Sequence, residues 1–206
     1  MSIKHGNTSI TAVKHQSTNI TTVYHGSTQV FTAGVSVTIV KPAGSMTVYY
    51  KANGASSYTS TTATSTVVTC NKNSVLYIYV TTATGYVTEF TSSSPQHFTI
   101  GTVAKTVTPL VIQTPTVNIT KTKVIRTTYD YELSGVTNND SSSITAVSIT
   151  DTSGNTISLG ETIDARAIQT YSTPLGIGRG SITFTFVFKS NANGASSHNY
   201  TLTVTP

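Results

Sequence analysis

Along most of the chain, apolar residues (valine, isoleucine and the aromatic residues) alternate with the hydroxyl-bearing residues threonine and serine. The clearest run is 181–188, in which Ile182, Phe184, Phe186 and Phe188 are separated by Thr183, Thr185 and Val187. A period of two sends successive side chains to opposite faces of a strand, so this pattern predicts strands with one buried and one solvated face. The same kind of pattern predicts further strands at 35–40, 46–50, 75–80, 129–133, 144–149 and 200–204.

The composition fits strands and little else. The 206 residues include 43 threonines and 26 serines but only six leucines, and 9% of residues are charged. Strong helix formers are scarce, while Val, Ile, Thr and Tyr suit a pleated surface. This excludes a mostly helical protein, a coiled coil and an α/β nucleotide enzyme. A hydrophobic content of 37% argues against a disordered chain.

The first 32 residues contain a repeat of ten residues, with units at 3–12, 13–22 and 23–32. Each unit holds a β-branched residue, a histidine, a turn pair, a threonine and a second β-branched residue. This order predicts a strand–turn–strand element that is too small to bury its own apolar face. We therefore expect residues 1–34 to be a docking or oligomerising segment. Its expected anchoring side chains are Ile3, Ile10, Val13, Ile20, Val23, Tyr24, Val30 and Phe31.

The remaining length predicts two immunoglobulin-like β-sandwiches, at 35–108 and 109–206, because such a domain takes about 100 residues. The linker Thr108-Pro109 with Thr114-Pro115 marks the expected boundary. The string Ala-Asn-Gly-Ala-Ser-Ser occurs at 52–57 and again at 192–197, and its Asn-Gly pair predicts two hairpin tips. The glycine-rich string at 176–180 precedes a strand rather than a helix, so it predicts a flexible loop and no phosphate site.

No catalytic constellation stands out from this serine-rich background, so we expect a protein that is not an enzyme and needs no cofactor. Histidines His5, His15 and His25 share one repeat position and could converge on a metal if the repeats stack. The repeats supply no Cys, Asp or Glu to complete such a site, which argues against a metal centre. The single cysteine, Cys70, lies in the apolar run 67–70 and is expected to be a core residue of a buried strand.

The net charge of +5 comes from scattered basic residues, so we expect no nucleic-acid partner. No apolar stretch is long enough for a membrane span, and the N-terminal residues lack the apolar region of a signal peptide. A hydroxyl-rich exterior made without an export signal fits a virion protein, which is assembled inside the cell and exposed after lysis.

The third repeat unit, Val23-Tyr24-His25-Gly26-Ser27-Thr28-Gln29-Val30, resembles short repeats near the start of tailed-bacteriophage virion proteins. Those repeats precede immunoglobulin-like domains in head decoration, head-fibre or tail proteins, including those of crAss-like phages. The first two units depart from the pattern, with Lys4 and Lys14 at the tyrosine position and Gln16 at the glycine position. The resemblance implies an N-terminus anchored to capsid, portal or tail proteins and a homo-oligomer with projecting sandwiches.

The main prediction is thus a non-enzymatic virion structural protein, an auxiliary capsid or head-fibre component. One alternative is a tail or surface adhesin that contacts host glycans weakly; its sugar-binding face would be lined by tyrosines, since tyrosine joins an apolar body to a polar tip. The candidates are Tyr49, Tyr50, Tyr77, Tyr79 and Tyr86. A second alternative is a single jelly-roll capsid protein formed by the whole chain.

Overall fold

The structure, a computed structural model, describes residues 34–206 throughout. Of residues 1–33 it describes the backbone of six short strands, with the side chains of Ile20 and Val23 alone. The strands are β1 (Lys4–His5), β2 (Thr8–Ser9), β3 (Val13–His15), β4 (Thr18–Ile20), β5 (Thr22–His25) and β6 (Thr28–Thr32).

These six strands form three antiparallel hairpins, β1 with β2, β3 with β4 and β5 with β6, each a separate two-stranded sheet. In each hairpin a histidine is paired with a threonine. The three pairs are His5 with Thr8, His15 with Thr18 and His25 with Thr28. The ten-residue repeat of the sequence is therefore a repeated hairpin backbone.

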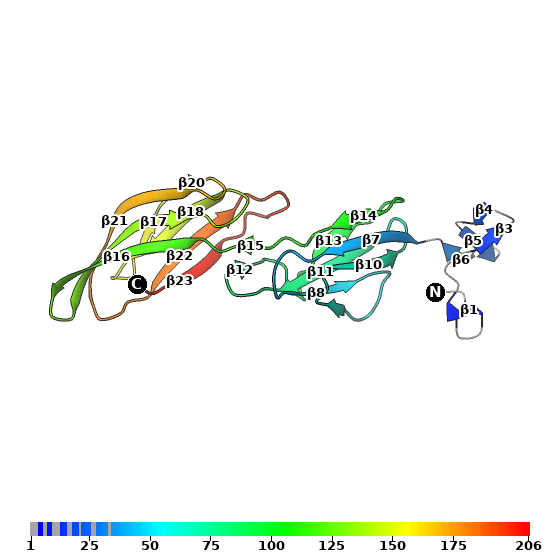
Figure 1. Cartoon of the computed structure of the whole chain (residues 1–206), viewed down its shortest axis with the longest axis horizontal. Coiled ribbons are helices and arrows are strands. Elements are labelled where there is room, and N and C mark those ends of the chain that lie inside the picture. Colours follow the sequence, from blue (N-terminus) through cyan, green and yellow to red (C-terminus); the bar gives the residue numbers. More distant parts are fainter. Residues whose placement is uncertain are drawn as a thin grey trace. The chain divides into compact units, whose positions relative to one another are not determined.

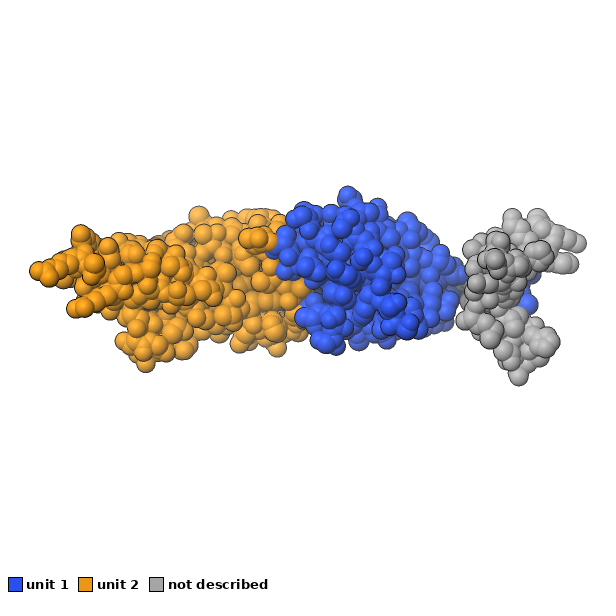
Figure 2. All heavy atoms as spheres, turned by 90° about the horizontal axis from the view of Figure 1, so that it is seen from below, with its two compact units in different colours: residues 1–83, 90–110 blue, residues 84–89, 111–206 orange. Residues whose placement is uncertain are grey.

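The described residues contain no helix, so the predicted all-β class is confirmed. The chain divides into two compact units, coloured separately in Figure 2. Unit 1 comprises Met1–Ala83 and Phe90–Leu110, and unit 2 comprises Thr84–Glu89 and Val111–Pro206. Among the described residues, no single jelly roll spans both units. The sequence did not indicate that Thr84–Glu89 belongs with the second unit.

Besides the three hairpins, unit 1 contains two larger sheets (Figure 1). Its strands are β7 (Val35–Val40), β8 (Thr47–Lys51), β9 (Thr59–Thr61), β10 (Ser65–Cys70), β11 (Val75–Thr81), β13 (Gln96–Thr99) and β14 (Lys105–Val107). One sheet has the order β10-β7-β14, with β14 parallel to β7, and the other has the order β13-β11-β8-β9. Every second residue of β7 and β11 is buried, as alternation predicts for strands with one face on a core.

Cys70 is a buried free cysteine, as predicted, and burial raises the pKa of its thiol. The prediction of a buried strand around it is wrong. Val67 is 68% exposed, and Cys70 is the only residue of β10 that is fully buried. The physical reason is position: β10 is an edge strand of its sheet, so one of its faces and one of its edges remain open.

Unit 2 also contains two principal sheets. Its strands are β12 (Tyr86–Val87), β15 (Ile112–Gln113), β16 (Thr116–Ile125), β17 (Thr128–Thr137), β18 (Ile144–Thr150), β19 (Thr156–Ser158), β20 (Thr162–Ile163), β21 (Ile168–Arg179), β22 (Phe184–Ser190) and β23 (Tyr200–Val204). One sheet is β16-β17-β21 and the other is β19-β18-β22-β23, with β20 pairing to β18 and a small β12-β15 ladder besides. The rings of Tyr131 and Phe184 meet between the two sheets at a centroid distance of 5.4 Å.

The two units differ in strand order. An immunoglobulin constant domain, with strands named A to G, pairs A-B-E-D in one sheet and C-F-G in the other. Unit 2 follows this plan, because its first, second and fourth long strands, β16, β17 and β21, share a sheet and β18, β22 and β23 share the other. Unit 1 follows a different plan, in which its first strand, β7, pairs with its fourth, β10, and its last, β14.

The glycine-rich string at 176–180 is not the predicted loop. Residues 176–179 are the end of β21, a strand of 12 residues. Pro174 is tolerated because β21 is the edge strand of its sheet. At Gly178 an added Cβ would lie 1.9 Å from Ile182 Cδ1, so the glycine there makes room for a close neighbour. Proline and glycine, which are typical of turns, thus lie inside a strand here.

A buried polar cluster fastens the loops at one end of unit 2. The Asn138 side chain is 1% exposed and donates to the carbonyl oxygens of Ser142, Ile163 and Asp164 at 2.9–3.1 Å. Its Oδ1 accepts from the Asp140 amide at 2.9 Å, and the Asp140 carboxylate accepts from the amides of Ser142 and Gln113. Asn138 and Asp140 together therefore connect three segments of the chain, at residue 113, at 138–142 and at 163–164.

Candidate functional site

The most distinctive surface of unit 1 is the solvent side of its four-stranded sheet. Leu76, Ile78 and Val80 of β11 are buried, so the alternate residues Tyr77 and Tyr79 lie on the opposite face. Cross-strand pairing extends this face in two rows. His97, Tyr77 and Lys51 form one row across β13, β11 and β8, and Tyr79, Tyr49 and Ser60 form the next across β11, β8 and β9.

The aromatic rings on this face are in mutual contact. Tyr49 and Tyr79 stack with parallel planes and centroids 4.6 Å apart. Tyr58, from the loop before β9, meets the Tyr79 ring edge-on at 4.9 Å, and His97 meets Tyr77 edge-on at 4.8 Å. Aromatic contacts of this kind hold the rings in fixed orientations. We call Tyr49, Lys51, Tyr58, Tyr77, Tyr79 and His97 the aromatic face.

Lys51 places a positive charge within the aromatic face. Its Nζ lies 5.0 Å from the centroid of Tyr58 and 5.5 Å from that of Tyr77, both within the range of a cation–π interaction. Burial, then repulsion from Tyr79 and Tyr77, raises the pKa of the Tyr58 hydroxyl above its usual value. The Tyr58 hydroxyl therefore stays protonated and able to donate a hydrogen bond at neutral pH.

Charge is divided unequally between the two units. All seven carboxylate side chains of the chain lie in unit 2: Glu89, Asp130, Glu132, Asp140, Asp151, Glu161 and Asp164. Unit 1 has none, and it carries six lysines: Lys4, Lys14, Lys41, Lys51, Lys72 and Lys105. The net charge of +5 is thus +6 on unit 1 and −1 on unit 2, counting histidine as neutral. Lys51 has no carboxylate partner within its own unit.

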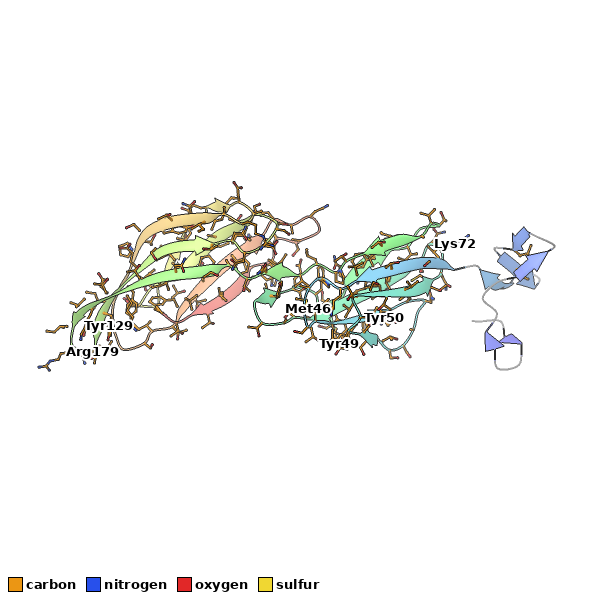
Figure 3. All side chains as sticks on the ribbon, in the orientation of Figure 1. Met46, Tyr49, Tyr50, Lys72, Tyr129 and Arg179 are labelled. Carbon is orange, nitrogen blue, oxygen red and sulfur yellow. The ribbon has the colours of Figure 1, made fainter. Side chains whose placement is uncertain are left out.

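Three of the five tyrosines predicted for a sugar-binding surface, Tyr49, Tyr77 and Tyr79, come together on the aromatic face. Tyr50, labelled beside Tyr49 in Figure 3, is paired with the buried Ile78 and so lies on the core side of β8. Tyr86 belongs to unit 2. The sequence prediction missed Tyr58, Lys51 and His97. A correct prediction of which residues of β8 and β13 pair with β11 would have placed Lys51 and His97 beside Tyr77. Tyr58 comes from a loop, whose sequence has no periodic pattern to indicate its position.

The predicted docking residues are only partly described. Val13 and Ile20 are cross-strand partners, as are Val23 and Phe31, and both Ile20 and Val23 are half-buried. Tyr24 lies in β5 and Val30 in β6, with side chains outside the described residues. Ile3 and Ile10 lie wholly outside them.

The metal hypothesis for His5, His15 and His25 also falls on side chains that the structure does not describe. Within the described part of the chain, no group of three His, Cys, Asp or Glu side chains is arranged to hold a metal ion. Within the same part, no helix has the length and apolar character needed to cross a membrane.

Comparisons with known proteins add little. No family model matches the chain, and no curated protein matches its sequence. Solved structures that match include a "putative carbohydrate binding protein" from Bacteroides uniformis, at 10% identity and a TM-score of 0.29, covering 84% of this chain and 98% of that one. A DUF3823 family protein from Bacteroides ovatus matches at 13% identity and a TM-score of 0.28, covering 83% and 97%. TM-scores this low carry no argument about the fold or function of the chain.

Proposed function

We propose that the chain is a non-enzymatic surface protein whose unit 1 binds carbohydrate through the aromatic face. The observation that carries this proposal is the contact cluster of four tyrosines with Lys51 on the solvent side of one sheet. The exposed strand positions of this unit are mostly threonine and serine. A cluster of half-buried large rings on the solvent side of such a sheet is typical of a binding site.

The chemistry of the aromatic face suits a sugar ring. One face of a pyranose ring is made of C–H groups, whose partial positive charge is attracted to the negative face of an aromatic ring. The hydroxyls of the sugar need hydrogen-bond partners at the edge of that contact. Tyrosine hydroxyls, the Lys51 ammonium and the imidazole of His97 supply both donors and acceptors there.

The test is a glycan array followed by titration of the strongest ligands by isothermal calorimetry. Tyr79 contacts both Tyr49 and Tyr58, so Tyr79→Ala should weaken binding by at least tenfold, the loss typical of a central aromatic residue. Tyr171→Ala, a tyrosine of unit 2, is the matched control and should leave binding unchanged. Equal binding by wild type and Tyr79→Ala, or wild type that binds no glycan, would reject the proposal.

We further propose that the N-terminal repeat docks the protein on a larger assembly, in agreement with the predicted virion role. This is supported by the three hairpins, each of which is a separate two-stranded sheet among the described residues. An isolated hairpin is marginal in water and has two open edges, so it gains stability by adding its strands to another sheet. The virion location, its capsid, portal or tail partners and the homo-oligomer stay predictions.

Light scattering after size-exclusion chromatography tests the docking proposal with the chain alone. We expect the full chain to form oligomers through the repeat and a variant with residues 1–32 deleted to be monomeric. The deletion should leave the circular dichroism of the β-sandwiches in place. An oligomer of the same size in both proteins would show that the repeat does not mediate self-association.

A further inference from the structure

We infer that the aromatic face selects glycans that carry a negative charge, such as uronate, sialate or sulfate groups. This inference rests on the proposed function and adds the ligand class. It follows from where the charges lie in unit 1 rather than from the rings themselves.

Lys51 provides the first argument. Its ammonium lies between the rings of Tyr58 and Tyr77, and a ring face removes little of the hydrogen-bonding capacity of an ammonium group. The group is therefore held in place while its N–H donors stay available to a ligand. A neutral sugar hydroxyl would accept an ordinary charge–dipole hydrogen bond, whereas a carboxylate or sulfate would form an ion pair with charge-assisted hydrogen bonds, which are stronger.

The second argument is the lack of any competing anion. Unit 1 contains no aspartate or glutamate, so no side chain of the unit can neutralise Lys51 or repel an acidic ligand. An average domain has acidic residues distributed over its whole surface, whereas unit 1 carries basic side-chain charges alone.

Two more lysines are held near the edges of the same sheet. Lys105 donates to the carbonyl oxygen of Thr99, the last residue of edge strand β13, at 3.2 Å. Lys41 donates to the carbonyl oxygen of Thr62, which follows edge strand β9, at 2.8 Å. One lysine ammonium thus lies beside each edge strand of the sheet, so an acidic glycan that extends from the aromatic face past either edge would come near a second cation.

The test compares matched ligands on one array: uronate-, sialate- and sulfate-bearing oligosaccharides beside the same chains after carboxyl reduction, desialylation or desulfation. We expect the charged members to bind about tenfold more tightly than their neutral counterparts, a difference of about 1.4 kcal/mol. Added salt should weaken the charged members selectively, because ions screen exposed charges. Single-stranded oligothymidylate is included as a second polyanion.

The variant Lys51→Met keeps the aliphatic stem and removes the charge. It should abolish the preference for charged over neutral oligosaccharides, while the binding of neutral oligosaccharides persists. Lys121→Met is the matched control, because Lys121 makes the same kind of contact with Tyr129 in unit 2 at 4.6 Å. Equal binding of charged and neutral members by the wild type would overturn the inference and leave the proposed function standing. Wild type that binds no glycan would overturn both, and tighter binding of oligothymidylate than of any acidic glycan would assign the face to nucleic acid.

Discussion

Tyr131 and Tyr200 are both buried in unit 2, at 0% and 4% exposure, but their hydroxyls differ. The Tyr131 hydroxyl donates to the carbonyl oxygen of Gly180 at 2.5 Å. The Tyr200 hydroxyl has no hydrogen-bond partner among the described residues. Burial, and then the nearby charge of Glu89, raises the pKa of Tyr200 to about 12, so this hydroxyl is also neutral at physiological pH.

The same substitution should therefore have opposite effects at these two sites. Tyr131→Phe loses a satisfied hydrogen bond and should lower the free energy of unfolding by about 1 kcal/mol. Tyr200→Phe removes a buried polar group that has no partner, so it should be neutral or stabilising by up to about 1 kcal/mol. Urea denaturation of the two variants measures both changes, and a Tyr200→Phe protein that is less stable than Tyr131→Phe would contradict the assignment.

Asn138 should be among the most sensitive positions of unit 2. Asn138→Ala leaves three buried or part-buried carbonyl oxygens and one buried amide without their partner, so we expect a loss of about 2–4 kcal/mol in the free energy of unfolding. The neighbouring Asn139 is half-buried and donates to Thr114 and Thr116 only. In thermal unfolding, Asn139→Ala should have a clearly higher Tm than Asn138→Ala. Similar losses in Tm for the two variants would show that the cluster does not fasten the loops.

The environment of Asp151 predicts that the stability of unit 2 depends on pH. Backbone donation from Asn155 is the main cause that lowers the pKa of this carboxyl below its usual value, and the Asn155 side chain and the Ser153 amide act in the same direction. A carboxyl whose pKa is lower in the folded state adds stability that is present above its unfolded pKa of about 3.9 and is lost as the pH falls through the folded pKa.

Asp151→Asn keeps an oxygen acceptor and removes the titration. Its free energy of unfolding, measured by urea denaturation from pH 6 to pH 2, should therefore fall less steeply below pH 4 than that of the wild type. Identical acid profiles for the two proteins would show that Asp151 does not contribute to the pH dependence.

At the scale of elements, one hexapeptide forms two different turns. Both copies of Ala-Asn-Gly-Ala-Ser-Ser lie in loops between paired strands, as predicted, and in each the second alanine amide donates to the first alanine carbonyl at 3.0 Å. In the first copy Asn53 and Gly54 both have positive φ, 56° and 70°, the pattern of a type I′ turn. In the second copy Gly194 has a positive φ of 86° but Asn193 does not, which is the pattern of a type II turn.

The asparagines of these two turns should therefore not be equivalent. Asn53 adopts the left-handed conformation, donates to the Thr69 carbonyl and accepts from the Asn71 amide at 2.6 Å. Asn53→Ala should cost about 1–2 kcal/mol in the free energy of unfolding of unit 1, since alanine disfavours positive φ and the two hydrogen bonds are lost. Asn193→Ala, the control in unit 2, should cost less than about 0.5 kcal/mol. Equal costs in chemical denaturation would contradict the difference in turn type.

Sequence patterns predicted most strands but not their arrangement. The alternation at 35–40 and 75–80 identifies the core faces of β7 and β11, because one buried side is enough to impose a period of two. The string at 176–180 gave the wrong prediction because Gly178 makes room for the neighbouring Ile182 side chain within a strand rather than forming a turn. Lys51 and His97 lie on the aromatic face because both are cross-strand partners of Tyr77. Local sequence patterns do not show which distant segments pair, so they could not predict these two residues.

At the scale of the whole molecule, the chain passes between its two units three times, after Ala83, after Glu89 and after Leu110. The segment Thr84–Glu89 contributes β12 to unit 2, where β12 pairs with β15. Glu89 also accepts hydrogen bonds from the amide and the hydroxyl of Ser196. A boundary drawn at Pro109 would therefore remove part of unit 2.

A fragment of residues 109–206 tests this division by amide hydrogen exchange. The Thr114 amide donates to the Gly85 carbonyl, which the fragment lacks, so it should lose protection relative to the whole chain. The Gln113 amide donates to the Asp140 carboxylate, which the fragment retains, so it should stay protected. Unchanged protection at Thr114 would show that β12 is dispensable.

The three passages between units also bear on how such a protein can be inherited. Domains joined by one linker can be exchanged among genes by a single recombination event at that linker. Here any single crossover point between the units leaves at least one unit incomplete, either unit 2 without β12 or unit 1 without β13 and β14. We therefore expect relatives of this chain to keep both units together in one gene.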